Sequence, residues 1–248
     1  MTSHARQTPV IWLHPSSVAG VEIFNPNYWD GASKTFVQSC WSEYSVLHHC
    51  SKQINDICAN AGSLVTSHLE SLNAQWNAKR FPLQEMIFFA EEPDLHIRIE
   101  AFFCGMKSVL DLLAQLLSTE KIVSCKIDGF HRHKDVLGGK IVNALSNNVV
   151  KGRNEAAHKI AALILDHKSC WIDQAIHTRD FLVHPSRGAQ QLMFKLDIVE
   201  ANGLLVCRGA FPPEIDSVPI QAYAKTSMAN IAAFSVAFLA LLKGAHNV

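Results

Sequence analysis

Apolar residues recur every three or four positions over most of this 248-residue chain, a spacing typical of helices with one buried face. Such stripes cover residues 33–79, 95–117 and 154–183. The first stripe predicts one long helix, or two helices that break near Gly62. Before the second stripe, Asp94 is a suitable N-cap because its carboxylate can accept from the first free N–H groups of a helix. The pattern therefore predicts long helices.

The spacing changes to alternation near the C-terminal end of the chain. Within residues 192–199 apolar and polar side chains alternate from 194 to 198, residues 204–208 are a short, mostly apolar run, and Asn202-Gly203 stands between the two segments. Asn-Gly is the pair that best tolerates the positive φ angles of a tight two-residue turn. These residues predict a β-hairpin over 191–209.

One apolar stretch, residues 228–242, imitates a membrane span. A span needs about 20 apolar residues. This stretch is shorter, and Asn230 and Ser235 interrupt it. We interpret it as a buried helix that runs from about residue 218 or 220 and stops at Gly244, and we expect no contact with a membrane.

Together these elements predict a mainly α fold, a helical bundle with long antiparallel helices and one β-hairpin inserted before the last helix. Prolines and glycines punctuate residues 1–32, so we expect an irregular N-terminal segment there and a single domain over 33–248. Strands and helices do not alternate along the chain, and no glycine-rich phosphate loop is present. These absences argue against a nucleotide-binding parallel sheet.

The charge balance limits the classes of partner. The chain has 22 basic and 22 acidic residues, so its formal net charge is zero. A protein that coats nucleic acid has a basic excess, whereas a small local phosphate site needs none. Seven scattered cysteines without a Cys-x-x-Cys pair predict reduced thiols and a cytoplasmic location, and no apolar segment of a signal peptide follows the N-terminus.

Some of the histidines stand where they could bind a metal. His131 and His133 are the best pair, but only Asp128 and Asp135 stand near them at ligand spacing. A surface loop is the better interpretation of these residues. We therefore expect no metal and no cofactor.

The candidate catalytic residues lie at the end of the third stripe, where Arg179, Asp180 and His184 precede Pro185. Residues five apart on a helix point in different directions, but proline pushes the preceding residue out of the helical region. The ring of His184 can then turn back toward Arg179. A histidine can move the proton of a ribose 2′-OH, and an arginine can stabilise the charge that builds up on the phosphorus centre. This pattern favours RNA cleavage without a metal.

Further residues complete or compete with this site. Arg187 and Lys107 are the candidate substrate-binding cations, although Lys107 is also well placed to pair with Asp111 on a solvated helix face. A second match to the pattern, Arg153 with His158, lies at a helix start, with Asn154 as its expected N-cap. We prefer the pair Arg179 and His184 because it follows a long helix and precedes a turn.

The motif helix resembles that of the HEPN superfamily of helical-bundle proteins. The residues that carry the resemblance are Trp171-Ile-x-x-x-Ile-x-x-Arg179-Asp180-x-x-x-His184 and the upstream helix with Ile99-Glu100-Ala-Phe-Phe103, Lys107 and Asp111. The likeness would cover about residues 33–243. Asp180 stands where the family more often has Asn, and the hairpin departs from the plain bundle.

The resemblance implies an all-α bundle that forms a homodimer, often with metal-independent ribonuclease activity in toxin–antitoxin or phage-defence systems. Arg179 would bind the scissile phosphate, His184 would be the acid or base, and Asp180 would orient them. One histidine does not easily act as both acid and base, and a twofold axis would bring a second copy of the motif alongside.

Two hypotheses follow. The first is an endoribonuclease of HEPN type, with RNA as substrate and an antitoxin or other protein as partner. The second is a non-catalytic helical scaffold, or a module that binds nucleotides or partner proteins, as other HEPN members do. Zero net charge and the apolar last helix support the second hypothesis.

Overall fold

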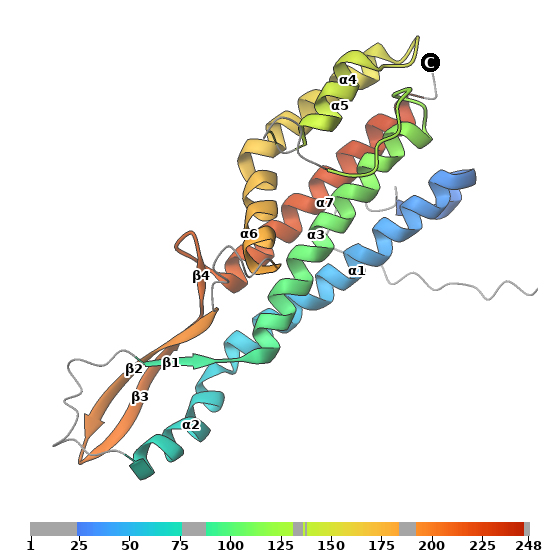
Figure 1. Cartoon of the computed structure of the whole chain (residues 1–248). Coiled ribbons are helices and arrows are strands. Elements are labelled where there is room, and N and C mark those ends of the chain that lie inside the picture. The colour runs from blue at the N-terminus through green and yellow to red at the C-terminus, as the bar shows by residue number, and fades with distance from the viewer. Residues whose placement is uncertain (1–23, 76–87, 131–135, 137, 184–191, 246–248) are drawn as a thin grey trace, which may run out of the picture.

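The computed structural model describes residues 24–75, 88–130, 136, 138–183 and 192–245, and it confirms a mainly α fold. The helices within these residues are α1 (Gly31–Ala59), α2 (Ala61–Gln75), α3 (Pro93–Thr119), α4 (Gly139–Asn147), α5 (Asn154–His167), α6 (Asp173–Val183) and α7 (Ile220–Gly244). Figure 1 shows α1, α3 and α7 side by side, with α1 antiparallel to the other two. These three helices enclose most of the core.

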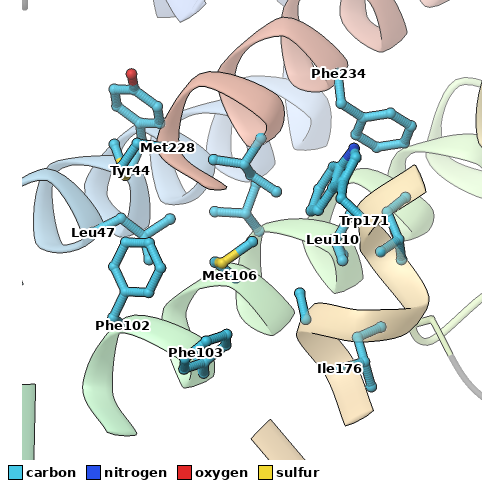
Figure 2. Packing of buried hydrophobic residues seen from close by; sticks show 14 of the residues in the cluster. Tyr44, Leu47, Phe102, Phe103, Met106, Leu110, Trp171, Ile176, Met228 and Phe234 are labelled. Carbon is cyan, nitrogen blue, oxygen red and sulfur yellow. The ribbon is translucent and has the colours of Figure 1, made fainter. Parts of the chain in front are cut away.

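The contact between α1 and α3 is unusually close. A Cβ at Gly105 would lie 3.0 Å from Cδ2 of Leu47, so a residue with any side chain would press on α1. Leu47 and Phe102 are fully buried beside this position (Figure 2). Each such side chain contributes about 1.5–3 kcal/mol by leaving water.

The first three helices, α1 to α3, agree with the sequence patterns except for the N-cap residue of α3. The first stripe forms two helices that break at Asn60, whose side-chain amide donates to the Asp56 carbonyl at 2.8 Å. Asp94 is not the N-cap of α3. Glu92 caps this helix by accepting from the N–H of Asp94 at 3.2 Å, because Pro93 already occupies the first helical turn. Ahead of α1, Phe24 is buried against Trp41, so the described end of the N-terminal segment belongs to the core.

The predicted helix 154–183 is interrupted. A π-helical turn, Lys168–Ile172, separates α5 from α6. In this turn the Trp171 indole N–H donates to Nδ1 of His167 at 2.8 Å. The chain bends there, so that α5 lies along α7 and α6 lies against α3 (Figure 1).

The predicted hairpin is part of a larger sheet. Strands β2 (Met193–Ala201) and β3 (Leu204–Phe211) pair across Asn202 and Gly203, both of which have positive φ. A third strand that the patterns did not predict, β1 (Phe88–Glu91), pairs antiparallel with β2. Two short strands, β4 (Glu214–Ile215) and β5 (Val218–Pro219), then lead into α7. The β-structure before α7 is therefore more than one hairpin.

Two helices, α3 and α7, are long and apolar enough to cross a membrane by length and composition alone. About half of each apolar window is buried against the rest of the chain. Core helices of soluble proteins have the same character. A cytoplasmic location stays a prediction.

Candidate functional site

The candidate site begins at the C-terminal end of α6. This helix places Ala175, Ile176 and Leu182 in the core, and Val183 is its last described residue. His184 and Arg187 lie outside the described residues. Their position relative to Arg179 stays a prediction.

Arg179 and Asp180 form an ion pair at this helix end. Nη1 of Arg179 donates to Oδ1 of Asp180 at 3.0 Å. Adjacent residues on a helix point about 100° apart, so the long arginine side chain must curl back to reach its neighbour. The two side chains are only 27% and 20% exposed. Partial burial makes this pair stronger than one in full solvent.

The guanidinium group of Arg179 also meets α3. It interacts with the side chain of Cys104, which lies on that helix. Burial by itself lowers the pKa of Arg179, but hydrogen bonds with Asp180 and Cys104 outweigh it, so the pKa is raised overall. Nε of Arg179 is buried and finds no acceptor among the described residues. Buried N–H groups nearly always have a partner, so this cation has donor capacity that the described chain leaves unused.

Lys107 lies one helical turn beyond Cys104 on α3. It forms the expected ion pair with Asp111, and Asp111 also accepts from the N–H of Phe130 at 2.6 Å. The Lys107 side chain is 16% exposed, so this is a largely covered pair rather than a solvated helix face. The spacing of three residues places Lys107 on the same side of α3 as Cys104.

A cavity of about 200 Å³ opens beside α6, on a face that does not include Arg179. It is lined by Gln174, His177, Thr178, Phe181, Leu182, Leu192, Ile215 and Asp216. The Gln174 side chain bonds to Asp216, which ties α6 to the turn between β4 and β5. His177 is exposed here and was not a candidate in the sequence, although its place two residues before Arg179 is a usable signal. Ligand sites measure about 300–1,000 Å³, so this cavity suits a small group.

The second sequence match, Arg153 with His158, lies at the start of α5. Arg153 is the N-cap position, and Asn154 is already helical, so Asn154 is not the cap. Arg153 lines a cavity of about 190 Å³ against the end of α7. His158 is exposed and does not line this cavity. The structure does not bring these two residues into one pocket.

The π-helical turn was not visible in the sequence patterns. Burial lowers the pKa of His167 more than the nearby carboxylate of Asp166 raises it. The imidazole packs edge to face against Phe234 of α7, with ring centroids 5.2 Å apart. Such turns are frequent at functional sites. Here the half-buried ring accepts from Trp171 and packs on Phe234, so we interpret it as structural.

Metal ligands do not gather within the described part of the chain, where no three His, Cys, Asp or Glu side chains form a cluster. The candidate pair His131 and His133 lies outside the described residues. The chain matches no protein-family model, no curated protein and no solved structure. The functional argument therefore depends on the residues themselves.

Proposed function

We propose that this protein is a metal-independent endoribonuclease of HEPN type, in which Arg179 binds the scissile phosphate. The observation that carries the proposal is the guanidinium group of Arg179, fixed by Asp180 with an N–H that has no acceptor among the described residues. A fixed, partly covered guanidinium is well suited to stabilising charge that develops on a phosphate, because it needs little reorganisation.

In the proposed reaction the base, His184, takes the proton of the ribose 2′-OH. The 2′-oxygen attacks phosphorus, the bond to the 5′-oxygen breaks, and the leaving oxygen takes a proton from an acid. The products are a 2′,3′-cyclic phosphate and a 5′-hydroxyl end. In a homodimer the second histidine would come from the other subunit, with Lys107 and Arg187 binding neighbouring phosphates. We place this activity in the cytoplasm, in a toxin or phage-defence role with a partner protein.

The test is digestion of single-stranded RNA in EDTA by the full chain. We expect His184→Ala and Arg179→Ala each to lower the cleavage rate at least 100-fold, in line with the loss of an acid–base group or a charge-stabilising group. His158→Ala is the matched control, because His158 is exposed on α5 and should be dispensable. Equal cleavage by wild type and His184→Ala would refute the assignment and reveal a contaminating nuclease.

A second candidate is a non-catalytic scaffold that binds a partner protein. The ion pair between Arg179 and Asp180 favours this candidate, because the Asp180 carboxylate neutralises the positive charge of Arg179 that would bind a phosphate. Asp180→Asn separates the two functions, since it frees the arginine and keeps a polar side chain. The nuclease should stay active or gain activity on this change. A scaffold would show no cleavage in either form and would keep its oligomeric state in both.

A further inference from the structure

A second surface with distinct chemistry lies between α1 and α7, away from the α3–α6 contact. The two helices are antiparallel (Figure 1), and a groove of about 530 Å³ runs between them. One stripe of α1 and one stripe of α7 form its walls, and the lining residues are Tyr44, His48, Ser51, Lys52, Asn55, Gln221, Lys225, Met228 and Ala229. Its volume falls within the range of about 300–1,000 Å³ that is usual for small-molecule sites.

Helical spacing explains why these residues meet. The α1 residues lie four, three, one and three positions apart, and the α7 residues lie four, three and one apart. Side chains at such intervals share one face of a helix. Tyr44 and Met228 are buried and lie close together at one end (Figure 2). The apolar part of the groove is thus the edge of the core, and its polar part is the solvent side.

The charges of the lining all have one sign. Lys52 and Lys225 are exposed on opposite walls, and neither forms an ion pair within the described part of the chain. No carboxylate lines the groove. The imidazole of His48 also lines the groove, and the Ser51 hydroxyl and the Asn55 amide are neutral hydrogen-bond donors. Two ammonium groups across a groove without an acid favour an anionic ligand between them.

Whereas the two lysines favour an anionic group on the ligand, Gln221 favours a hydrogen-bond donor. Its amide oxygen Oε1 is buried and receives no hydrogen bond among the described residues. An unpaired buried acceptor costs about 1–3 kcal/mol, which a ligand donor would recover. A fully ionised anion such as sulfate has no such donor, whereas a sugar hydroxyl beside a phosphate has one. The groove therefore matches a molecule with both groups.

We propose that the α1–α7 groove binds a phosphate monoester that carries a neighbouring hydroxyl group. The phosphate lies between Lys52 and Lys225, and the hydroxyl donates to Gln221. A sugar phosphate, a free ribonucleotide and the 5′-phosphorylated end of an RNA strand share this chemistry. The site uses none of the residues assigned to RNA cleavage, so it stands whether or not the chain is a nuclease.

The experiment is isothermal titration of the full chain in EDTA with three probes. These are ribose 5-phosphate, AMP and an RNA hexamer that is 2′-O-methylated except at its first nucleotide, the hexamer being tested with and without a 5′-phosphate. The best probe should lose at least tenfold in affinity on the double change Lys52→Gln and Lys225→Gln. Its dependence on salt should also fall, because each lysine that contacts a phosphate releases about one counterion.

Lys126→Gln is the matched control. Lys126 is an exposed lysine outside the groove, so this variant removes one positive charge, as each of the two groove changes does, and should stay within twofold of wild type. Gln221→Leu should lower affinity several-fold without changing the salt dependence, since it removes a neutral bond. Circular dichroism checks that each variant is folded.

The outcomes separate the sources of the phosphate. Preference for ribose 5-phosphate or AMP supports a free metabolite, and preference for the phosphorylated hexamer over its unphosphorylated form supports an RNA end. Equal losses in Lys126→Gln and the groove variants would overturn the proposal, as would failure of every probe to bind at millimolar concentration. A negative result for RNA cleavage would leave the proposal unaffected.

Discussion

The side-chain amide of Asn73 takes the place of a neighbouring strand by bonding to both main-chain groups of Leu205. Nδ2 of Asn73 donates to the Leu205 carbonyl at 3.0 Å, and the N–H of Leu205 donates to Oδ1 of Asn73 at 2.6 Å. Asn73 lies on α2, and Leu205 lies on β3, one of the two outer strands of the three-stranded sheet. A helix side chain thereby covers the edge of the sheet, where unpaired main-chain groups invite association.

Removal of this amide should loosen the contact between the sheet and α2. We expect Asn73→Ala to lower the free energy of unfolding by about 1–3 kcal/mol, because two main-chain groups lose their partner. Urea unfolding followed by circular dichroism measures the change. Asn147→Ala is the control, since the Asn147 amide is exposed and bonds to exposed Asn143 on α4, so this change should alter stability by less than about 0.5 kcal/mol. Equal effects of the two changes would contradict the role of Asn73.

The close approach of α1 and α3 at Gly105 gives a second prediction. Gly105→Leu should destabilise the protein by about 1–3 kcal/mol, because the new side chain must displace Leu47 from a fully buried position. Gly62→Leu is the matched change on α2, where an added Cβ meets nothing within 4 Å. It should leave stability unchanged or raise it by up to about 1 kcal/mol, owing to better helix propensity. Thermal unfolding measures both changes: the Tm should fall for Gly105→Leu and should stay the same or rise for Gly62→Leu.

The sequence was sufficient for those elements that local residues determine. The apolar stripes predicted the long helices, and Asn202-Gly203 predicted the turn between β2 and β3, where both residues have positive φ. These signals are local because hydrogen bonds within one helix or one turn join residues a few positions apart.

The rest depends on contacts between distant segments. The pairing of β1 with β2 joins residues about a hundred positions apart, and Asn73 and Leu205 are separated by 132 positions. The contact of Arg179 with Cys104 likewise needs α6 to lie on α3, and the π-helical turn helps to set that arrangement. No periodicity in one sequence encodes such contacts, so the ion pair at the candidate site was foreseeable and its surroundings were not.

The half-buried imidazole of His167 should make stability depend on pH. Its pKa is lowered in the folded protein, chiefly by burial, below the value of 6.5 of a free histidine. The unfolded chain therefore binds the proton more readily, and the contribution is complete above pH 6.5 and is lost as the pH falls toward the lowered pKa. Urea midpoints between pH 7 and 5 should fall less steeply for His167→Gln than for wild type. His49→Gln, at an exposed position on α1, should keep the slope of wild type.

The cysteines should differ sharply in reactivity, because the thiolate is the reactive form. Cys170 is exposed in the π-helical turn, whereas Cys40 is fully buried on α1. Burial, with a smaller effect from the nearby Glu43 carboxylate, raises the pKa of Cys40 to about 12, and burial raises the pKa of Cys58 to about 11. With iodoacetamide at pH 8, peptide mapping by mass spectrometry should show Cys170 modified first and Cys40 last. In concentrated urea all seven should react alike, since unfolding removes the differences in burial. Modification of Cys40 as fast as Cys170 in the native protein would mean that α1 is not packed in the core as the structure has it.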